Sequence, residues 1–93
     1  MPNFTTRVAL SDAEWEDYDK LYEYMATEGF TKTITSDQGI TYKLPDAEYN
    51  YSGNITRADV LKKARSAAQR TGKRHSVIVT ESAGRTWHNL EQV

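Results

Sequence analysis

The basic side chains between residues 57 and 74 are the group in this sequence best suited to bind a ligand. Seven lysines and arginines there are opposed by one acid, Asp59, so the segment has a net charge of +6. Such a surface is typical of phosphate-backbone binding, and tyrosines on nearby strands offer faces on which bases can stack. We therefore predict a nucleic acid-binding surface that consists of Lys62, Lys63, Arg65, Arg70, Lys73, Arg74, Tyr42 and Tyr51.

An acidic segment of equal and opposite charge spans residues 11 to 28. Seven acids there are opposed by one base, Lys20, which gives a net charge of −6. Neighbouring carboxylates on a helix point in different directions, so they do not form a catalytic pair, and a solvated face is one interpretation. The basic segment could likewise be a solvated face without a binding role. The complementary charges also support a second hypothesis, a non-enzymatic interaction or regulatory module that self-associates through the two helices.

Motifs for other kinds of chemistry are absent from the sequence. There is no P-loop, no dinucleotide-binding glycine motif and no calcium loop. His75 and His88 lie thirteen positions apart without a neighbouring cysteine or spaced carboxylate, so we expect neither a metal site nor a cofactor. Histidine side chains often serve as general acids or bases, and His75 could do so, or it could simply sit at the edge of a strand.

Residues 56 to 72 form the clearest predicted helix. Val60, Leu61, Ala64, Ala67 and Ala68 make one narrow apolar stripe, so the backbone can pack closely on a sheet. The start of the helix is predicted by a capping box of Thr56 with Asp59 and by a hydrophobic staple of Ile55 with Val60. Gly72 is predicted to occupy the left-handed position just after the helix.

The acidic segment is predicted to form an earlier helix with similar end signals. Ser11 and Glu14 match a capping box, and Leu10 and Trp15 match a hydrophobic staple. The buried stripe is then expected to consist of Trp15, Tyr18, Leu21 or Tyr22, and Met25. Gly29 is predicted to end the helix, with Phe30 folding back on Met25.

Alternating apolar residues predict strands at residues 4–10, 30–36, 40–44, 48–52 and 74–81. A turn at Asp37 to Gly39 joins the second and third runs into a hairpin, and the fourth continues it or forms its own strand. The consecutive apolar residues 77–79 indicate burial on both faces or partial cover by a neighbouring strand. In residues 83–93, Trp87 and Leu90 have the spacing of a single helical turn.

This order predicts an α+β, ferredoxin-like β-α-β-β-α-β sandwich, with an antiparallel four-stranded sheet and both helices on one face. Residues 1–82 would form the domain, and residues 83–93 a C-terminal tail. The other sheet face would carry Thr5, Arg7, Thr31, Thr33 and Thr35. Few of these side chains are charged, which favours a face partly covered by a second copy, so we expect a homodimer.

Composition is typical of a single soluble domain. The chain has 93 residues, of which 38% are hydrophobic and 27% charged, and it has no cysteine, so disulfides are excluded and a cytoplasmic location is expected. The first residues lack the features of a signal peptide, and no apolar run is long enough to span a membrane, so no membrane partner is expected.

The hairpin region resembles the GhoS family, the antitoxins of type V toxin–antitoxin systems. The resemblance rests on Phe30-Thr31-Lys32, Asp37-x-Gly39-Ile40, Leu44 and a polar turn before Tyr49, and it extends loosely over residues 4 to 68. It implies a ferredoxin-like fold and an endoribonuclease that cleaves the messenger RNA of a small membrane toxin. The first helix is more acidic than in that family, and the tail differs.

Two residues are candidates for catalysis if the protein cleaves RNA. Arg7 would stabilise charge that develops on a phosphate, and Asp37 would orient a 2′-hydroxyl or a water. The alternatives are a position at the rim of the sheet for Arg7 and a role in turn formation for Asp37.

Overall fold

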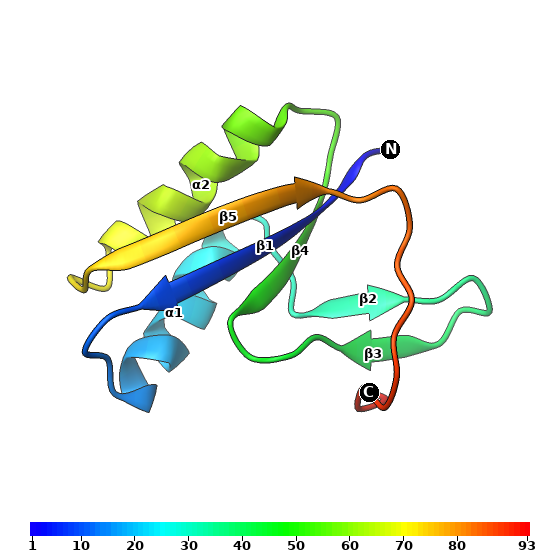
Figure 1. The fold of residues 1–93 in the computed structure, drawn as a ribbon, viewed down its shortest axis with the longest axis horizontal. Coiled ribbons are helices and arrows are strands. Elements are labelled where there is room, and N and C mark those ends of the chain that lie inside the picture. Colours follow the sequence, from blue (N-terminus) through cyan, green and yellow to red (C-terminus); the bar gives the residue numbers. More distant parts are fainter.

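The computed structural model of the protein describes residues 1–93 and has the order β-α-β-β-β-α-β (Figure 1). The strands are β1 (Asn3–Leu10), β2 (Thr33–Thr35), β3 (Thr41–Lys43), β4 (Glu48–Ser52) and β5 (His75–Glu81). The helices are α1 (Trp15–Thr27) and α2 (Arg57–Gln69). Neither helix is both long and apolar enough to cross a membrane.

The strands form two antiparallel sheets instead of the predicted four-stranded one. One sheet has the order β4-β1-β5, and β2 and β3 form a separate hairpin. A single bridge joins the two sheets, because Thr31 and Asn50 exchange two backbone hydrogen bonds of 2.8 Å. Beyond this bridge, the Lys32 Nζ donates to the carbonyl oxygens of Pro45 (2.8 Å) and Glu48 (2.9 Å). The Lys32 side chain thus occupies the Glu48 carbonyl, which a longer β2 would otherwise pair with, and the pairing between β2 and β4 is limited to the Thr31–Asn50 pair. The α+β class is confirmed.

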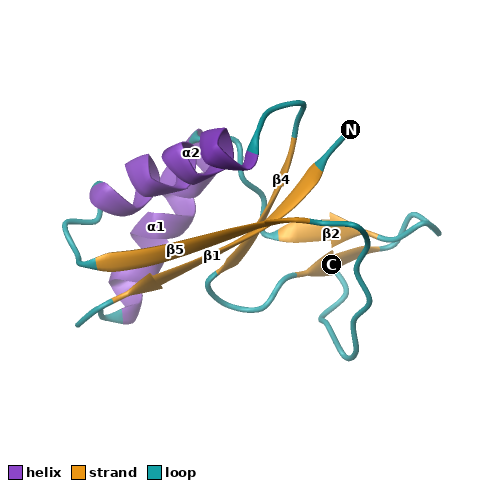
Figure 2. Cartoon of the chain, turned by 45° about the horizontal axis from the view of Figure 1, so that its top comes forward, coloured by secondary structure: helices purple, strands orange, loops and turns teal.

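Both helices lie on the same side of the three-stranded sheet, while the β2–β3 hairpin extends beyond them (Figures 1 and 2). The core fills the space between the helices and the sheet. Its buried members are Phe4, Val8, Leu21, Met25, Phe30, Tyr49, Val60, Ala64, Ala67 and Ala68. Small side chains on α2 let this helix approach the sheet closely, as its sequence pattern predicts.

The N-terminus of α2 has the predicted capping box, but its C-terminus does not have glycine at the predicted position. The Thr56 Oγ1 accepts from the Asp59 backbone N–H, and the Asp59 carboxylate accepts from the Thr56 N–H, both at 3.1 Å. These reciprocal bonds confirm the capping box. The helix ends at Gln69 with Arg70 as its cap, so Thr71 rather than Gly72 is the next residue. Gly72 still has the left-handed conformation, with φ of 75°, but it turns the loop into β5.

The start of α1 differs from the prediction. The Ser11 N–H donates to the carbonyl oxygen of Arg74 at 2.8 Å, so Ser11 still belongs to the extended chain beside β5. Asp12, with φ of 52°, then turns the chain, and Glu14 caps the helix in place of Ser11. This delay leaves Trp15 in the first turn with 73% of its surface exposed, so its predicted burial was wrong.

The end of α1 is as predicted. The N–H of Gly29 donates to Ala26 and that of Phe30 to Met25, both at 3.0 Å, which is the Schellman pattern. The φ of 97° at Gly29 explains the need for glycine there. Phe30 then lies in the core beside Met25.

Thr5, Arg7, Asn50 and Ile78 lie on the sheet surface that is turned away from the helices, the open face. Ile78 is 63% exposed there, whereas Val77 and Val79 pack toward the core. Burial of β5 on both faces, one of the two predictions for this strand, was therefore wrong. Consecutive side chains of a strand point to opposite faces of the sheet, so Val77 and Val79 face the core while Ile78 between them faces outward.

The tail contains no helix and does not form the predicted helical turn at Trp87 and Leu90; it bends at residues 88–89, where Asn89 has a φ of 62°. The Lys43 N–H donates to the Glu91 carbonyl (2.8 Å), and the Val93 N–H donates to the Thr41 carbonyl (2.9 Å). The free edge of β3 has backbone groups that need partners, and an extended segment satisfies them while a helical turn cannot. The tail thereby runs from the end of β5 to the far side of the hairpin.

Thr6 provides a test of the core. Its side chain is fully buried between β4 and β5, and its hydroxyl has no hydrogen-bond partner. Such a group costs about 1–3 kcal/mol, so we predict that Thr6→Val raises the free energy of unfolding by about 1 kcal/mol. Chemical denaturation measures the change, with Thr80→Val on the exposed side of β5 as the control. A loss of stability in Thr6→Val would show that the hydroxyl is bonded.

Candidate nucleic acid interface

The outer face of α2 holds basic side chains that the rest of the protein leaves free. Lys62 and Arg65 are exposed near the middle of the helix, and Arg74 is exposed just before β5. Of the bases between residues 57 and 74, only Lys73 forms an ion pair, with its Nζ 3.7 Å from an oxygen of Asp17. The predicted basic surface is therefore accessible.

Two other basic side chains of this surface rest on tyrosine rings. The Arg70 guanidinium carbon lies 4.3 Å from the ring centre of Tyr24 on α1, and the Lys63 Nζ lies 5.9 Å from that of Tyr51 on β4. These cation–π contacts hold the stems in place without neutralising the charges.

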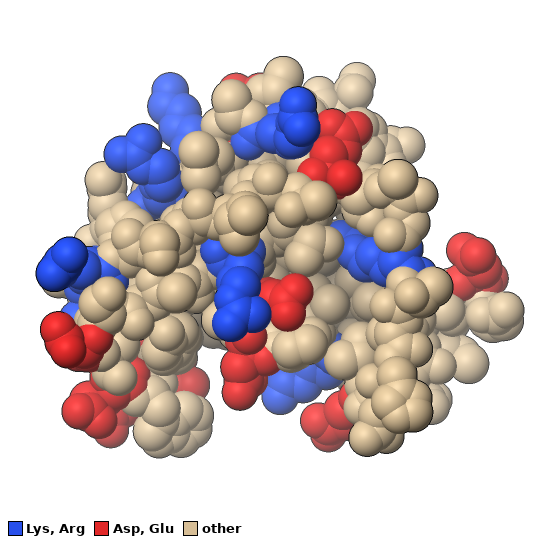
Figure 3. Space-filling model, in the orientation of Figure 1, with Lys and Arg blue, Asp and Glu red and all other residues tan.

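The acidic residues of α1 do not cancel the charge of α2. The Lys73–Asp17 contact is the one ion pair that links the two regions. In Figure 3, Lys and Arg side chains gather at the upper left, where α2 lies, and acidic side chains gather at the lower left, near the start of α1. In this view a basic area lies above an acidic one, and side chains of both signs are spread over the rest of the face.

The two tyrosines predicted to stack on bases occupy different places. Tyr51 lies on the helix side of the sheet, with ring centres 5.2 Å from Phe30 and 6.4 Å from Phe4. A Cβ added at Gly53 would come within 2.8 Å of this ring, so the chain closes tightly around it. Tyr42 lies on the hairpin with its ring 5.2 Å from that of Trp87. Tyr51 therefore supports the core, while Tyr42 and Trp87 form a pair outside it.

Arg7 lies on the open face, and its Nη1 is 3.9 Å from an oxygen of Glu48. It lines a cavity of about 510 Å³ together with Trp15, Lys32 and Tyr49. Burial lowers the pKa of Lys32, and burial, aided by the nearby Tyr22, raises the pKa of Tyr49 to about 12. Tyr49 thus stays neutral at ordinary pH.

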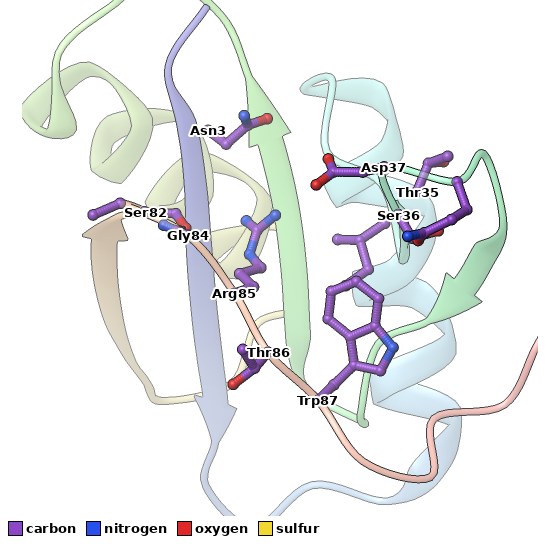
Figure 4. Close-up of a pocket in the computed structure, with 12 residues that line it drawn as sticks. Asn3, Thr35, Ser36, Asp37, Ser82, Gly84, Arg85, Thr86 and Trp87 are labelled. Carbon is purple, nitrogen blue, oxygen red and sulfur yellow. Dashed lines mark hydrogen bonds between the residues drawn. The ribbon is translucent and has the colours of Figure 1, made fainter.

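Asp37 lies in the β2–β3 turn and lines a different cavity of about 630 Å³. The walls of this cavity are the end of β2 with the turn after it, residue 3, residue 82 and residues 83–87 of the tail (Figure 4). Arg7 is not among its lining residues, so the structure does not bring Arg7 and Asp37 together.

Arg85 is a residue of this second cavity that the sequence pattern does not single out. Its Nε donates to the Thr5 Oγ1 at 3.0 Å, and its Nη2 donates to the Asn50 Oδ1 at 2.8 Å. Burial lowers the pKa of Arg85, and no carboxylate pairs with it. Because the tail has no periodic pattern, only its path across the open face reveals this position.

The histidines have ordinary surroundings. The His75 Nδ1 is 3.0 Å from the carbonyl oxygen of Lys73, at the start of β5, and His88 is exposed on the tail. The structure has no group of three or more His, Asp or Glu side chains arranged to hold a metal ion.

Compared with models of known protein families and with curated proteins, the sequence matches none. The resemblance to GhoS therefore gains no support and meets no contradiction from these comparisons.

Proposed function

We propose that the protein binds single-stranded RNA through the outer face of α2 and the loop that follows it. The observation that carries this proposal is the set of exposed, unpaired bases on that face, including Lys62, Arg65 and Arg74. A phosphate backbone would neutralise them and release its bound counterions, which is the main source of affinity for such surfaces.

The fold fits this proposal when it is treated as a ferredoxin-like arrangement with a shortened fourth strand. The Thr31–Asn50 bridge puts the chain before β2 next to β4, which extends the strand order β4-β1-β5 on its β4 side. A similar arrangement is what the GhoS resemblance implies. Fold likeness by itself does not determine function, so α2 remains the stronger support.

Cleavage of RNA is the further step that the resemblance implies. The geometry offers no catalytic pair for it, because Arg7 and Asp37 line separate cavities. Arg7 also pairs with the carboxylate of Glu48, which reduces the attraction of its positive charge for a phosphate. The observed surfaces therefore support binding more directly than cleavage.

A direct test mixes the purified protein with single-stranded RNA of random sequence at about 50 mM and about 200 mM salt. We expect binding that weakens strongly at the higher salt. The same samples, resolved by length beside an Arg7→Ala variant, report whether the RNA is cut and whether Arg7 takes part. Absence of binding at low salt, or binding that salt leaves unchanged, would contradict the proposal.

The unpaired acids of α1 favour a second candidate, a module that self-associates. With one ion pair between the helical regions of the same chain, the acidic area is free to meet α2 of another copy. A homodimer held in this way would dissociate as salt rises, because exposed charges are screened over about 10 Å at 0.1 M. Size measurements at low and high salt separate the candidates, since a monomer at both contradicts self-association.

A further inference from the structure

We propose that the cavity between the β2–β3 turn and the tail binds a phosphorylated nucleotide, either free or as one unit of an RNA strand. This proposal rests on the proposed RNA binding, because it names a nucleotide subsite on the open face, apart from α2. Its support is the meeting of three kinds of side chain in one cavity: a cation without a counter-ion, an aromatic ring and a carboxylate.

Arg85 supplies the cation. Its side chain is half-buried, and the two neutral partners that hold it, Thr5 and Asn50, leave its charge uncompensated. A guanidinium has five N–H donors, and those beyond these two bonds have no partner in the protein. A phosphate accepts two parallel N–H bonds from such a group, so it would supply the missing charge and the missing acceptors together.

Trp87 supplies the aromatic wall. It lines the cavity and is held by Tyr42, whose ring centre is 5.2 Å away. A ring fixed in this way can stack on a base without losing much conformational freedom, and stacking of this kind tolerates any base. The cavity volume of about 630 Å³ lies within the usual range for small-molecule sites.

Asp37 supplies the group that can recognise the sugar. It extends from the turn on the side of the cavity opposite the tail, as Figure 4 shows. An ionised carboxylate only accepts hydrogen bonds, so it repels phosphate and favours a hydroxyl donor. The ribose 2′-hydroxyl is such a donor and is absent from DNA, so the site is expected to prefer ribonucleotides.

The two tryptophans of the chain allow a test that locates the ligand. When light that tyrosine does not absorb is used for excitation, a Trp15→Phe variant fluoresces from Trp87 alone, and a Trp87→Phe variant from Trp15 alone. We expect adenosine monophosphate to quench the first protein in a saturable way and to leave the second unchanged. Quenching of Trp15 would place the nucleotide in the cavity that contains Arg7 and would overturn the proposal, as would no quenching in either protein.

Substitutions test the assigned roles in the Trp15→Phe protein. Arg85→Met should weaken binding of the monophosphate about tenfold and remove its advantage over adenosine, which has no phosphate. Arg85→Lys keeps the charge but not the planar fork, so its affinity for the monophosphate should lie between that of the protein with Arg85 and that of Arg85→Met. Asp37→Ala should bring ribose and deoxyribose nucleotides to equal affinity. Thermal unfolding of each variant checks that it is folded, and a folded Arg85→Met protein with full affinity would refute the assignment.

An RNA strand and a free nucleotide are distinguished with a six-nucleotide RNA. If the site serves a strand, Arg85→Met weakens binding of this RNA as well; if it serves a free nucleotide, only the monophosphate is affected. Failure of the two proposals can be told apart. RNA binding without quenching of Trp87 overturns the nucleotide site alone, whereas quenching by the monophosphate without any RNA binding overturns the proposed function and leaves the site as one for free nucleotides.

Discussion

Replacement of both Lys62 and Arg65 by alanine is expected to weaken binding of single-stranded RNA more than tenfold at about 0.15 M salt. Both side chains are exposed, and neither forms an ion pair within the protein. Each phosphate contact on a single strand contributes about 0.7 to the magnitude of the slope of log affinity against log salt concentration. At about 0.15 M salt, one such contact is therefore worth about fourfold in affinity. The double variant should therefore show a slope smaller in magnitude by about 1.4.

A matched control removes two positive charges elsewhere. Lys20 on α1 and Lys43 on β3 are exposed, so their double alanine variant has the same net charge as the α2 variant. Fluorescence anisotropy with a labelled RNA, repeated over a range of salt, measures affinity and slope for both. If the two variants lose affinity equally, net charge rather than the α2 surface governs binding, and the assignment of the interface is wrong.

Phe4→Ala is expected to lower the free energy of unfolding by about 3–5 kcal/mol. Phe4 has no exposed surface, and its ring lies between the helices and the sheet beside Tyr51. Alanine would leave a cavity that neighbouring side chains cannot fill, so the loss includes both transfer and cavity terms. For a small domain this loss is a large fraction of the whole free energy of unfolding, so the midpoint temperature of thermal unfolding should be much lower.

Trp15→Ala is the informative control for that measurement. The sequence pattern predicts that Trp15 is buried, but the structure exposes 73% of its surface. We expect its removal to change stability by no more than about 0.5 kcal/mol. A loss comparable to that of Phe4→Ala would mean that α1 begins earlier and buries Trp15.

Local signals in the sequence predict much of this fold. The Thr56–Asp59 capping box and the Gly29 ending of α1 are confirmed because they involve residues within one turn of each other. The apolar stripe of α2 predicts its buried face in the same way, since helical spacing alone brings those residues together. Strand β4 has the predicted bounds because its alternation is uninterrupted.

Features that depend on distant residues are not predicted. Ser11 matches a capping box, but its N–H is taken by Arg74, which lies far away in the sequence. The predicted pairing of β2 with β4 is limited to the Thr31–Asn50 bridge, and beyond it the Lys32 side chain bonds to the carbonyls of Pro45 and Glu48. Likewise, the basic surface can be identified by composition, whereas the cavity with Arg85 exists only because the tail pairs with β3 and crosses the sheet.

The most direct measurement for the role of α2 is the change in backbone amide chemical shifts when single-stranded RNA is added to the isotope-labelled protein. We expect the largest changes between Arg57 and Arg74, with a smaller set in the cavity that contains Arg85 if a nucleotide also lies there. Changes that are confined to α1, or that leave α2 unaffected at saturating RNA, would contradict the proposal that this helix forms the interface.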